Sequence, residues 1–147
     1  MFQHILVPTD GSLLSRKAIA QAVELAKTLG ARVTGFYVAP EYHFRIEHDY
    51  VSPGYMNRKQ YGAYVKRVAK TYLSPLERRA VADGVKCNSD YDLNDSPAEA
   101  ILKAAKRFKC DSIVMGSHGR SGLLKLFLGS ETQKVIQHAR VPVIVVR

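Results

Sequence analysis

The sequence predicts an α/β fold built on an open parallel sheet of five strands, with helices on both faces. Strand-like segments rich in β-branched residues alternate with segments whose apolar residues recur at helical spacing. No internal repeat, low-complexity tract or linker interrupts this alternation. A length of 147 residues suits one hydrophobic core, so we expect residues 1–147 to form a single domain.

The N-terminal segment has the pattern of strand, turn and helix. Ile5-Leu6-Val7 is typical of a short buried strand, and Pro8-Thr9-Asp10-Gly11-Ser12 is a turn cluster whose last residue can cap a helix. Helical spacing of apolar residues then continues until Gly30, which favours a left-handed helix stop. A second strand is predicted over residues 32–38, where apolar residues fall on both faces.

The middle of the chain contains the least regular segment. Residues 40–54 show no clear period and are expected to form a loop. Residues 57–81 favour a helix with an apolar stripe that includes Tyr61, Tyr64 and Tyr72, and Pro75 is a candidate interruption. A third strand is predicted over residues 85–91.

The C-terminal part continues the same order. Ser96-Pro97-Ala98-Glu99 matches a capping box with proline at the first helical position. A fourth strand is predicted over residues 112–115, a last helix from Ser130 and a closing strand over residues 141–146. Ligands of such sheets bind beyond the carboxyl ends of the strands where the winding reverses, so the loops after strands one and four would form the site if those strands are neighbours.

Composition limits the class of protein. The net charge of +9 favours polyanionic partners such as nucleotides, nucleic acid or acidic surfaces. No segment is apolar enough to span a bilayer and the N-terminus does not resemble a signal peptide, so a cytoplasmic protein without a membrane partner is expected. Cys87 and Cys110 lack metal-ligand spacing and are expected to be buried, reduced thiols.

A glycine-rich segment follows the predicted fourth strand. Gly116 and Gly119 would let backbone N–H groups approach a polyphosphate and adopt positive φ, and Gly129-Ser130 would add a helix N-terminus that attracts anions. Arg120 and Lys125 would add positive charge. A lone GxxG is more often a plain turn, but here the pattern extends to Gly-x2-Gly-x9-Gly-Ser between a strand and a helix.

This motif resembles that of the universal stress protein family. The opening Ile5-Leu6-Val7-Pro8-Thr9-Asp10-Gly11-Ser12, the Ser96-Pro97-Ala98-Glu99 helix start and the segment His138-Ala139-Arg140-Val141-Pro142-Val143 resemble the same family. The resemblance covers nearly the whole chain. It implies a Rossmann-like fold of the adenine nucleotide alpha hydrolase-like type and, because the long glycine motif is present, membership of the ATP-binding branch.

The resemblance also implies a set of nucleotide-binding residues. Asp10 would lie near the ribose, Val38 against the adenine and Met115 in the same pocket, with ATP accompanied by Mg²⁺ or Mn²⁺. The expected site consists of Pro8, Thr9, Asp10, Val38, Met115, Gly116, His118, Gly119, Arg120, Gly129, Ser130, Glu131 and Thr132. ATP, AMP and other adenine nucleotides are not distinguished.

Glu131 and three histidines each have alternative interpretations. Glu131 departs from the family pattern: inside the pocket it would repel a terminal phosphate or require a metal, and an outward, solvated position is favoured. His118 has no acid or nucleophile partner at a diagnostic spacing, so a positioning role is favoured over catalysis. His43 and His48 are expected to be solvated loop residues rather than metal ligands.

The leading hypothesis is a regulatory or stress-tolerance protein that uses bound nucleotide as a ligand. No Walker lysine motif or arranged nucleophile is present, so no catalytic residue is predicted and hydrolysis should be slow at most. The alternatives are a true ATPase, or a dimeric adaptor that binds nucleic acid or protein through basic residues of the 57–81 helix; a solvated face is favoured for those residues, and no RNA-binding signature is present.

A homodimer is expected to form through the last strand, from Val141 to Val146. This β-prone segment ends the chain, and a terminal strand often lies at a sheet edge with unpaired backbone groups. Proteins that this chain resembles associate through the same strand. The alternative is a strand that is central in its own sheet.

Overall fold

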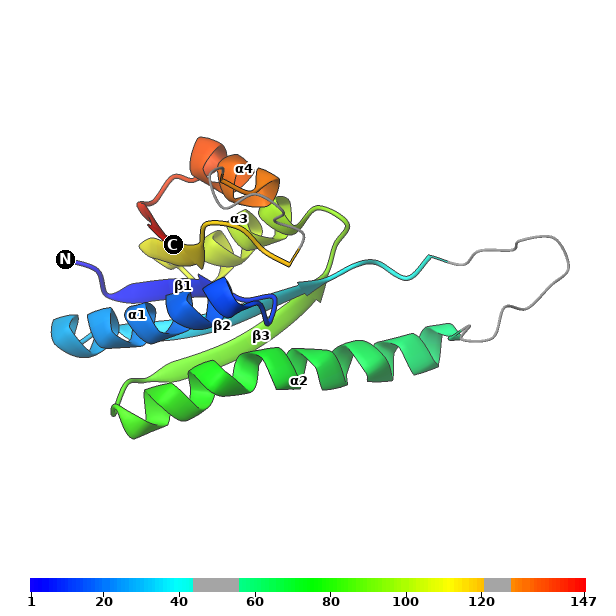
Figure 1. Cartoon of the computed structure of the whole chain (residues 1–147), viewed down its shortest axis with the longest axis horizontal. Coiled ribbons are helices and arrows are strands. Elements are labelled where there is room, and N and C mark those ends of the chain that lie inside the picture. The colour runs from blue at the N-terminus through cyan, green and yellow to red at the C-terminus, as the bar shows by residue number, and fades with distance from the viewer. Residues whose placement is uncertain (44–55, 121–127) are drawn as a thin grey trace, which may run out of the picture.

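A computed structural model describes residues 1–43, 56–120 and 128–147. Its elements alternate as predicted: β1 (His4–Pro8), α1 (Leu13–Leu29), β2 (Arg32–Ala39), α2 (Arg58–Ala82), β3 (Cys87–Leu93), α3 (Pro97–Arg107), β4 (Ser112–Gly116), α4 (Ser130–His138) and β5 (Val143–Val146). The strands form one parallel sheet in the order β3-β2-β1-β4-β5 (Figure 1). The predicted α/β fold is therefore confirmed.

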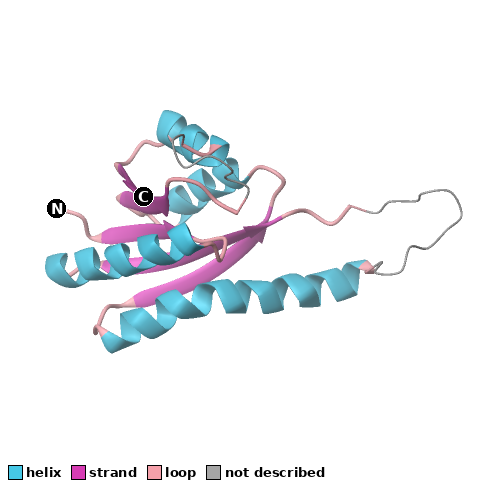
Figure 2. Ribbon diagram, viewed as in Figure 1, coloured by secondary structure: helices cyan, strands magenta, loops and turns pink. Residues whose placement is uncertain are grey.

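Helices cover both faces of the sheet, α1 and α2 on one face and α3 and α4 on the other (Figure 2). Successive side chains of a strand point to opposite faces. Ile5 and Val7 of β1 accordingly pack against α1, whereas Leu6 between them packs against α3. This burial on both faces explains why the central strands β1 and β4 are nearly continuous apolar runs rather than alternating ones.

The winding reverses between β1 and β4, which are hydrogen-bonded neighbours at the centre of the sheet. The chain moves from β1 outward to β2 and β3, returns to β4 on the other side of β1, and ends at β5. The adjacency on which the predicted crevice depends is thus present. The loops that follow β1 and β4 therefore leave the sheet side by side, at the carboxyl ends of its strands.

Several predicted boundaries are confirmed. Ser12 caps α1 by accepting a hydrogen bond from the backbone N–H of Ser15, and Gly30 ends the helix at φ 66°. Asn57 forms a capping box with Gln60 at the start of α2. Ser130 is the first residue of α4.

Other boundaries differ. β3 begins at Cys87 rather than at residue 85, because the N–H of Val85 bonds to Ala80 in the turn that ends α2. β5 begins at Val143 rather than at residue 141.

The predicted interruption at Pro75 is wrong, because α2 runs through it. Proline has no N–H to donate to the carbonyl four residues earlier. Here that carbonyl belongs to Thr71, and the hydroxyl of Ser74 donates to it at 3.3 Å. A neighbouring side chain thus replaces the missing backbone donor.

Candidate functional site

A cavity of about 570 Å³ opens beyond the carboxyl ends of β1 and β4. Every residue of the expected site lines it: Pro8, Thr9, Asp10, Val38, Met115, Gly116, His118, Gly119, Arg120, Gly129, Ser130, Glu131 and Thr132. Lys125, which the sequence placed in the same motif, lies outside the described residues. Segments that are more than a hundred residues apart in the chain therefore meet at one place.

The apolar wall of the cavity comes from strand ends and from α3. Val38 and Met115 contribute to it, and so do residues that the sequence analysis missed: Phe36, Pro40, Pro97 and Ile101. Phe36 lies two positions before Val38 on the same strand, so the period of two could have predicted that both face the cavity. The contribution of α3 could not be predicted, because it depends on how that helix packs beside α4.

Asp10 connects the two loops at the crevice. One carboxylate oxygen accepts a hydrogen bond from the backbone N–H of Ser12 at 2.9 Å, and the other accepts from the backbone N–H of Arg120 at 2.8 Å. Thr9 beside it is buried and donates to the hydroxyl of Ser15, another lining residue that the sequence analysis missed. Asp10 therefore fixes the start of the glycine segment and also places a carboxylate at the cavity.

The glycines of the motif are required for space rather than for backbone conformation. The expectation of positive φ at Gly116 and Gly119 is wrong, because positive-φ glycines among the described residues are Gly11, Gly30 and Gly84. A Cβ on Gly119 would overlap a carboxylate oxygen of Asp10. A Cβ on Gly129 would lie 3.0 Å from the Cα of His118.

The first turn of α4 closes the polar side of the cavity. The hydroxyl of Thr132 donates to the carbonyl of Gly116 at 3.1 Å and ties the helix to the end of β4. Gly129 precedes the helix and lines the cavity with Ser130, so the N–H groups of this turn are at the cavity. Unpaired N–H groups at a helix N-terminus attract anions.

Glu131 bridges α4 and α3. Its carboxylate accepts a hydrogen bond from the backbone N–H of Ala98 at 2.8 Å and pairs with Lys134 at 2.8 Å. Burial alone would raise the pKa of Glu131, but the hydrogen bonds from Lys134 and Ala98 outweigh it and lower the pKa below the ordinary value. The side chain lines the cavity and is engaged on both oxygens, unlike the solvated residue that was expected.

This contact also corrects the predicted capping box of α3. Ser96 makes no side-chain cap hydrogen bond, and Glu99 pairs with Lys103 instead. Glu131 supplies the acceptor from another helix.

The histidines do not form a metal site with other described residues. His118 lines the cavity, where its Nδ1 lies 3.1 Å from the hydroxyl of Ser117. His43 pairs with Asp95 at 2.6 Å, and His48 lies outside the described residues. Among the described residues, no cluster of three histidine, cysteine or carboxylate side chains could hold a metal ion.

The cavity therefore combines an apolar wall, a carboxylate at Asp10 and a glycine segment that leads to a helix N-terminus. The sequence profile of the universal stress protein family matches residues 1–147, which is the whole chain. The chain belongs to the universal stress protein family.

Similar proteins agree with this membership. The universal stress protein MJ0531 of Methanocaldococcus jannaschii is 32% identical over 153 residues, which cover 100% of this chain and 83% of that protein. The structure of MJ0577 from the same organism has a TM-score of 0.80 at 25% identity and covers 99% of this chain and 96% of that one. A universal stress protein in complex with cAMP has a TM-score of 0.68 at 21% identity, with coverage of 99% and 97%.

None of the helices in the described part of this family member is long and apolar enough to cross a membrane.

Proposed function

We propose that this universal stress protein binds an adenine nucleotide, in the first place ATP, and acts as a nucleotide-dependent regulatory or stress-tolerance protein. The observation that supports the proposal is the single cavity that joins an apolar wall to the glycine segment and the N-terminus of α4. Its volume of about 570 Å³ suits a small molecule. Solved family structures that hold cAMP, dAMP and AMP support the same ligand class.

In this proposal each part of the cavity has a role. The adenine lies on the apolar wall with Val38 and Met115, and Asp10 accepts hydrogen bonds from the ribose hydroxyls. The phosphates bind at the polar side, where small or N–H-donating residues gather: Gly116, His118, Gly119, Arg120, Gly129, Ser130 and Thr132. Pro8 and Thr9 complete the wall at the end of β1.

A divalent ion would be held mainly by the phosphates. Mg²⁺ is commonly bound through substrate phosphates and one or two protein oxygens rather than by a full protein cage. The described residues fit this arrangement, because they offer Ser130 and Asp10 at the cavity but no cluster of three metal-ligating side chains. Mg²⁺ or Mn²⁺ would neutralise phosphate charge beside Glu131.

The test is to identify the nucleotide without assuming it. Protein purified without added nucleotide is denatured and the released material is analysed by chromatography. Calorimetric titration of the emptied protein with ATP, AMP and adenosine, each with and without Mg²⁺, then ranks the ligands. We expect an adenine nucleotide to be released or bound, and a protein that neither releases nor binds one contradicts the proposal. A turnover assay with saturating Mg²⁺ tests the alternative of a true ATPase.

We further propose a homodimer through β5 and a cytoplasmic location. β5 lies at the edge of the sheet with one strand neighbour, β4. Cys87 and Cys110 are both free of disulfide bonds, which fits a reducing compartment.

A further inference from the structure

The charge of the protein is concentrated on one helix. α2 contains seven basic residues and one acidic residue, Glu77, so it contributes six of the nine excess positive charges. The basic residues are Arg58, Lys59, Lys66, Arg67, Lys70, Arg78 and Arg79, and all are exposed. Among the ion pairs of the described residues, only Arg79 of this set has a carboxylate partner, Asp83. The other six make no ion pair with a carboxylate of the described residues.

A row of tyrosine rings lies at the N-terminal end of the same helix. The ring centroids of Tyr42 and Tyr61 are 5.5 Å apart, and those of Tyr61 and Tyr64 are 6.3 Å apart. An arginine lies over each end of the row: Arg58 is 5.4 Å from the Tyr42 centroid and Arg67 is 5.7 Å from the Tyr64 centroid. We call these five residues the tyrosine–arginine row.

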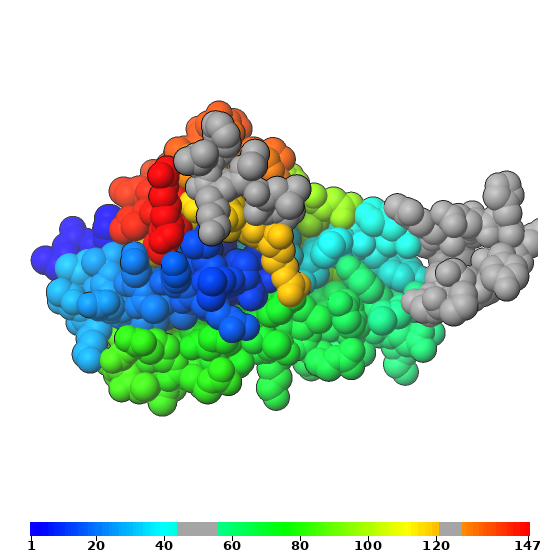
Figure 3. Space-filling view, viewed as in Figure 1, coloured from blue at the N-terminus to red at the C-terminus, as the bar shows by residue number. Residues whose placement is uncertain are grey.

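The row is fixed by hydrogen bonds from the hydroxyl groups of two of its tyrosines. The hydroxyl of Tyr61 donates to the carbonyl of Pro40 at 2.6 Å, and that of Tyr42 donates to the carbonyl of Met56 at 3.0 Å. These bonds join the segment after β2 to the start of α2, which lie against each other in Figure 3. Tyr64 at the end of the row is 40% exposed, so part of its ring is accessible.

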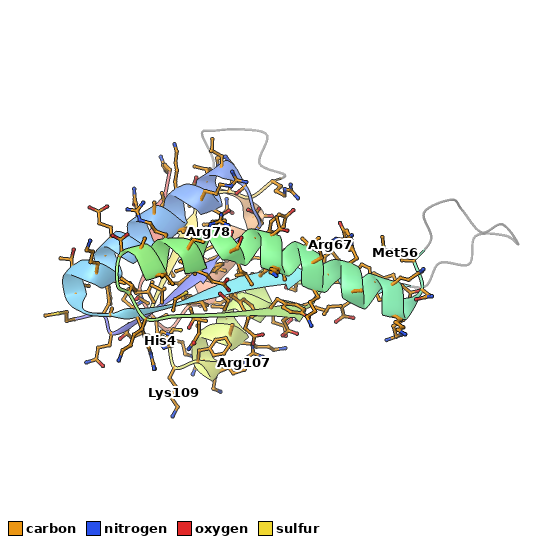
Figure 4. All side chains as sticks on the ribbon, turned by 90° about the horizontal axis from the view of Figure 1, so that it is seen from below. His4, Met56, Arg67, Arg78, Arg107 and Lys109 are labelled. Carbon is orange, nitrogen blue, oxygen red and sulfur yellow. The ribbon has the colours of Figure 1, made fainter. Side chains whose placement is uncertain are left out.

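Polar residues continue the row along the outer side of α2. Positions three and four apart lie on the same face of a helix. Tyr64, Arg67, Thr71, Ser74 and Arg78 follow this spacing, and Lys70 lies next to them. At 1.5 Å per residue the stripe from Tyr64 to Arg78 is about 21 Å long. Arg67 and Arg78 are labelled on α2 in Figure 4, which views the molecule from the side of this helix.

We propose that the tyrosine–arginine row and the adjoining stripe of α2 bind single-stranded nucleic acid. Proteins that bind single strands combine aromatic rings, on which bases stack, with cations that follow the phosphates, and both are present here in a fixed arrangement. This surface differs from the nucleotide cavity: none of Tyr42, Tyr61, Tyr64, Arg67 or Arg78 lines the cavity.

An anionic membrane surface is the less favoured partner. A helix that lies in a membrane interface needs a large apolar face opposite its charges. The apolar residues of α2, among them Val65, Ala69, Leu73 and Leu76, are buried against the protein. The stripe itself consists of polar residues.

The test is fluorescence anisotropy with a labelled single-stranded oligonucleotide of about twenty bases, measured across salt concentrations. We expect a Kd of about 100 µM or tighter at physiological salt, in the range of non-specific binding. Each neutralised phosphate contributes about −0.7 to the slope of log K against log salt for single strands. With Arg58, Arg67, Lys70 and Arg78 engaged, the slope should be about −2.8.

Variants separate the surface from the overall charge. The double variant Arg67→Gln, Lys70→Gln should reduce the slope to about −1.4. The matched control, Lys17→Gln with Lys106→Gln, removes two exposed charges from α1 and α3 and should bind more strongly than that double variant. Tyr64→Ala should weaken binding about fivefold or more without changing the slope, because it removes stacking and no charge.

Three outcomes would overturn the proposal. The first is no binding of the oligonucleotide at low salt, including the case in which the protein binds only vesicles that contain phosphatidylserine. The second is an equal loss of binding in the α2 variant and in the control. The third is displacement of the oligonucleotide by excess ATP, which would place it in the cavity.

Discussion

The hydroxyl of Tyr72 accepts a hydrogen bond from the guanidinium of Arg120, so a residue of α2 holds the glycine segment from outside the cavity. The Arg120 side chain also lies over the ring, 5.2 Å from its centroid. The same ring lies against Gly11, where any Cβ would overlap it. Tyr72 therefore contacts both loops that carry the candidate site.

Tyr72→Phe should weaken ATP binding about three- to tenfold. The ring stays, but the hydroxyl that fixes the Arg120 side chain is lost. Arg120 belongs to the loop whose backbone N–H is bound to Asp10. Part of the binding free energy must then be used to order this loop when the ligand binds. Calorimetry measures the change. Tyr64→Phe is the matched control on the same helix and should bind ATP like the wild type. If Arg120→Gln weakens binding and Tyr72→Phe does not, the positioning role is wrong.

Glu131→Gln should raise the affinity for ATP relative to that for AMP. The amide oxygen can still accept the hydrogen bond from Ala98. The substitution removes the negative charge beside Ser130, which in the wild type repels the additional phosphates of ATP. The ratio of the two dissociation constants, measured without divalent ions, reports this effect. An unchanged ratio would mean that the carboxylate does not sense the phosphates.

Glu131→Ala should lower the free energy of unfolding by about 1 kcal/mol, because α3 loses its acceptor at Ala98. Urea unfolding measures the loss. The lowered pKa of Glu131 adds a pH dependence: its contribution is present above the unfolded-state value and is lost as the pH falls through the folded-state pKa. Glu99→Ala, on the same helix end, should cost less, since Glu99 makes only an exposed pair with Lys103.

Gly119→Ala should abolish nucleotide binding or weaken it strongly. Its Cβ would displace the carboxylate of Asp10 and with it the N–H of Arg120. Gly62→Ala is the control: among the described residues, no atom beyond its own stretch of helix lies within 4 Å of its Cβ position, and alanine should stabilise α2 by about 0.5–1 kcal/mol. Equal affinity of the Gly119 variant and the wild type would place the site elsewhere.

The buried His4 should make stability depend on pH. Its Nε2 lies 2.7 Å from the Thr34 hydroxyl, and the residue is buried. Burial, followed by the charge of Arg32, lowers the pKa of His4 below 6.5. The unfolded state therefore binds more protons, so stability should fall as the pH drops below about 6.5. His4→Gln should make the free energy of unfolding depend less on pH below about 6.5. The control His138→Gln, at an exposed position, should leave this pH dependence unchanged.

Val145→Pro should convert the proposed homodimer to a monomer. The carbonyls of Pro142 and Val146 accept hydrogen bonds from Ile113 of β4 and from Ser117 just after it, so the alternation directs the backbone groups of Val143 and Val145 to the open edge. A proline removes one donor from that edge and leaves the bonds to β4 in place. Sedimentation of the wild type and of the folded variant tests this. A wild type that is monomeric at micromolar concentration would refute the dimer, and a dimeric variant would refute this interface.

The sequence by itself determined the order of elements, the caps at Ser12 and Gly30, the start of α2 near residue 57 and the position of the glycine motif. These features depend on local signals: apolar periodicity, turn residues and a glycine motif whose spacing can be counted along the chain. The resemblance to a family supplied the expected site residues, all of which line the cavity, but it did not supply Ser15, Phe36, Pro40, Pro97 or Ile101.

Only the tertiary structure decided which distant groups meet. Asp10 bonds to Arg120 across 110 positions, Tyr72 to Arg120 across 48, and Glu131 to Ala98 across 33. Propensity and periodicity describe neighbours in the chain, whereas these contacts depend on strand order and helix packing. The capping box of α3 was predicted wrongly for that reason. The acceptor for the backbone N–H of Ala98 is the carboxylate of Glu131, which the fold brings from α4, and the neighbouring Ser96 makes no side-chain cap hydrogen bond.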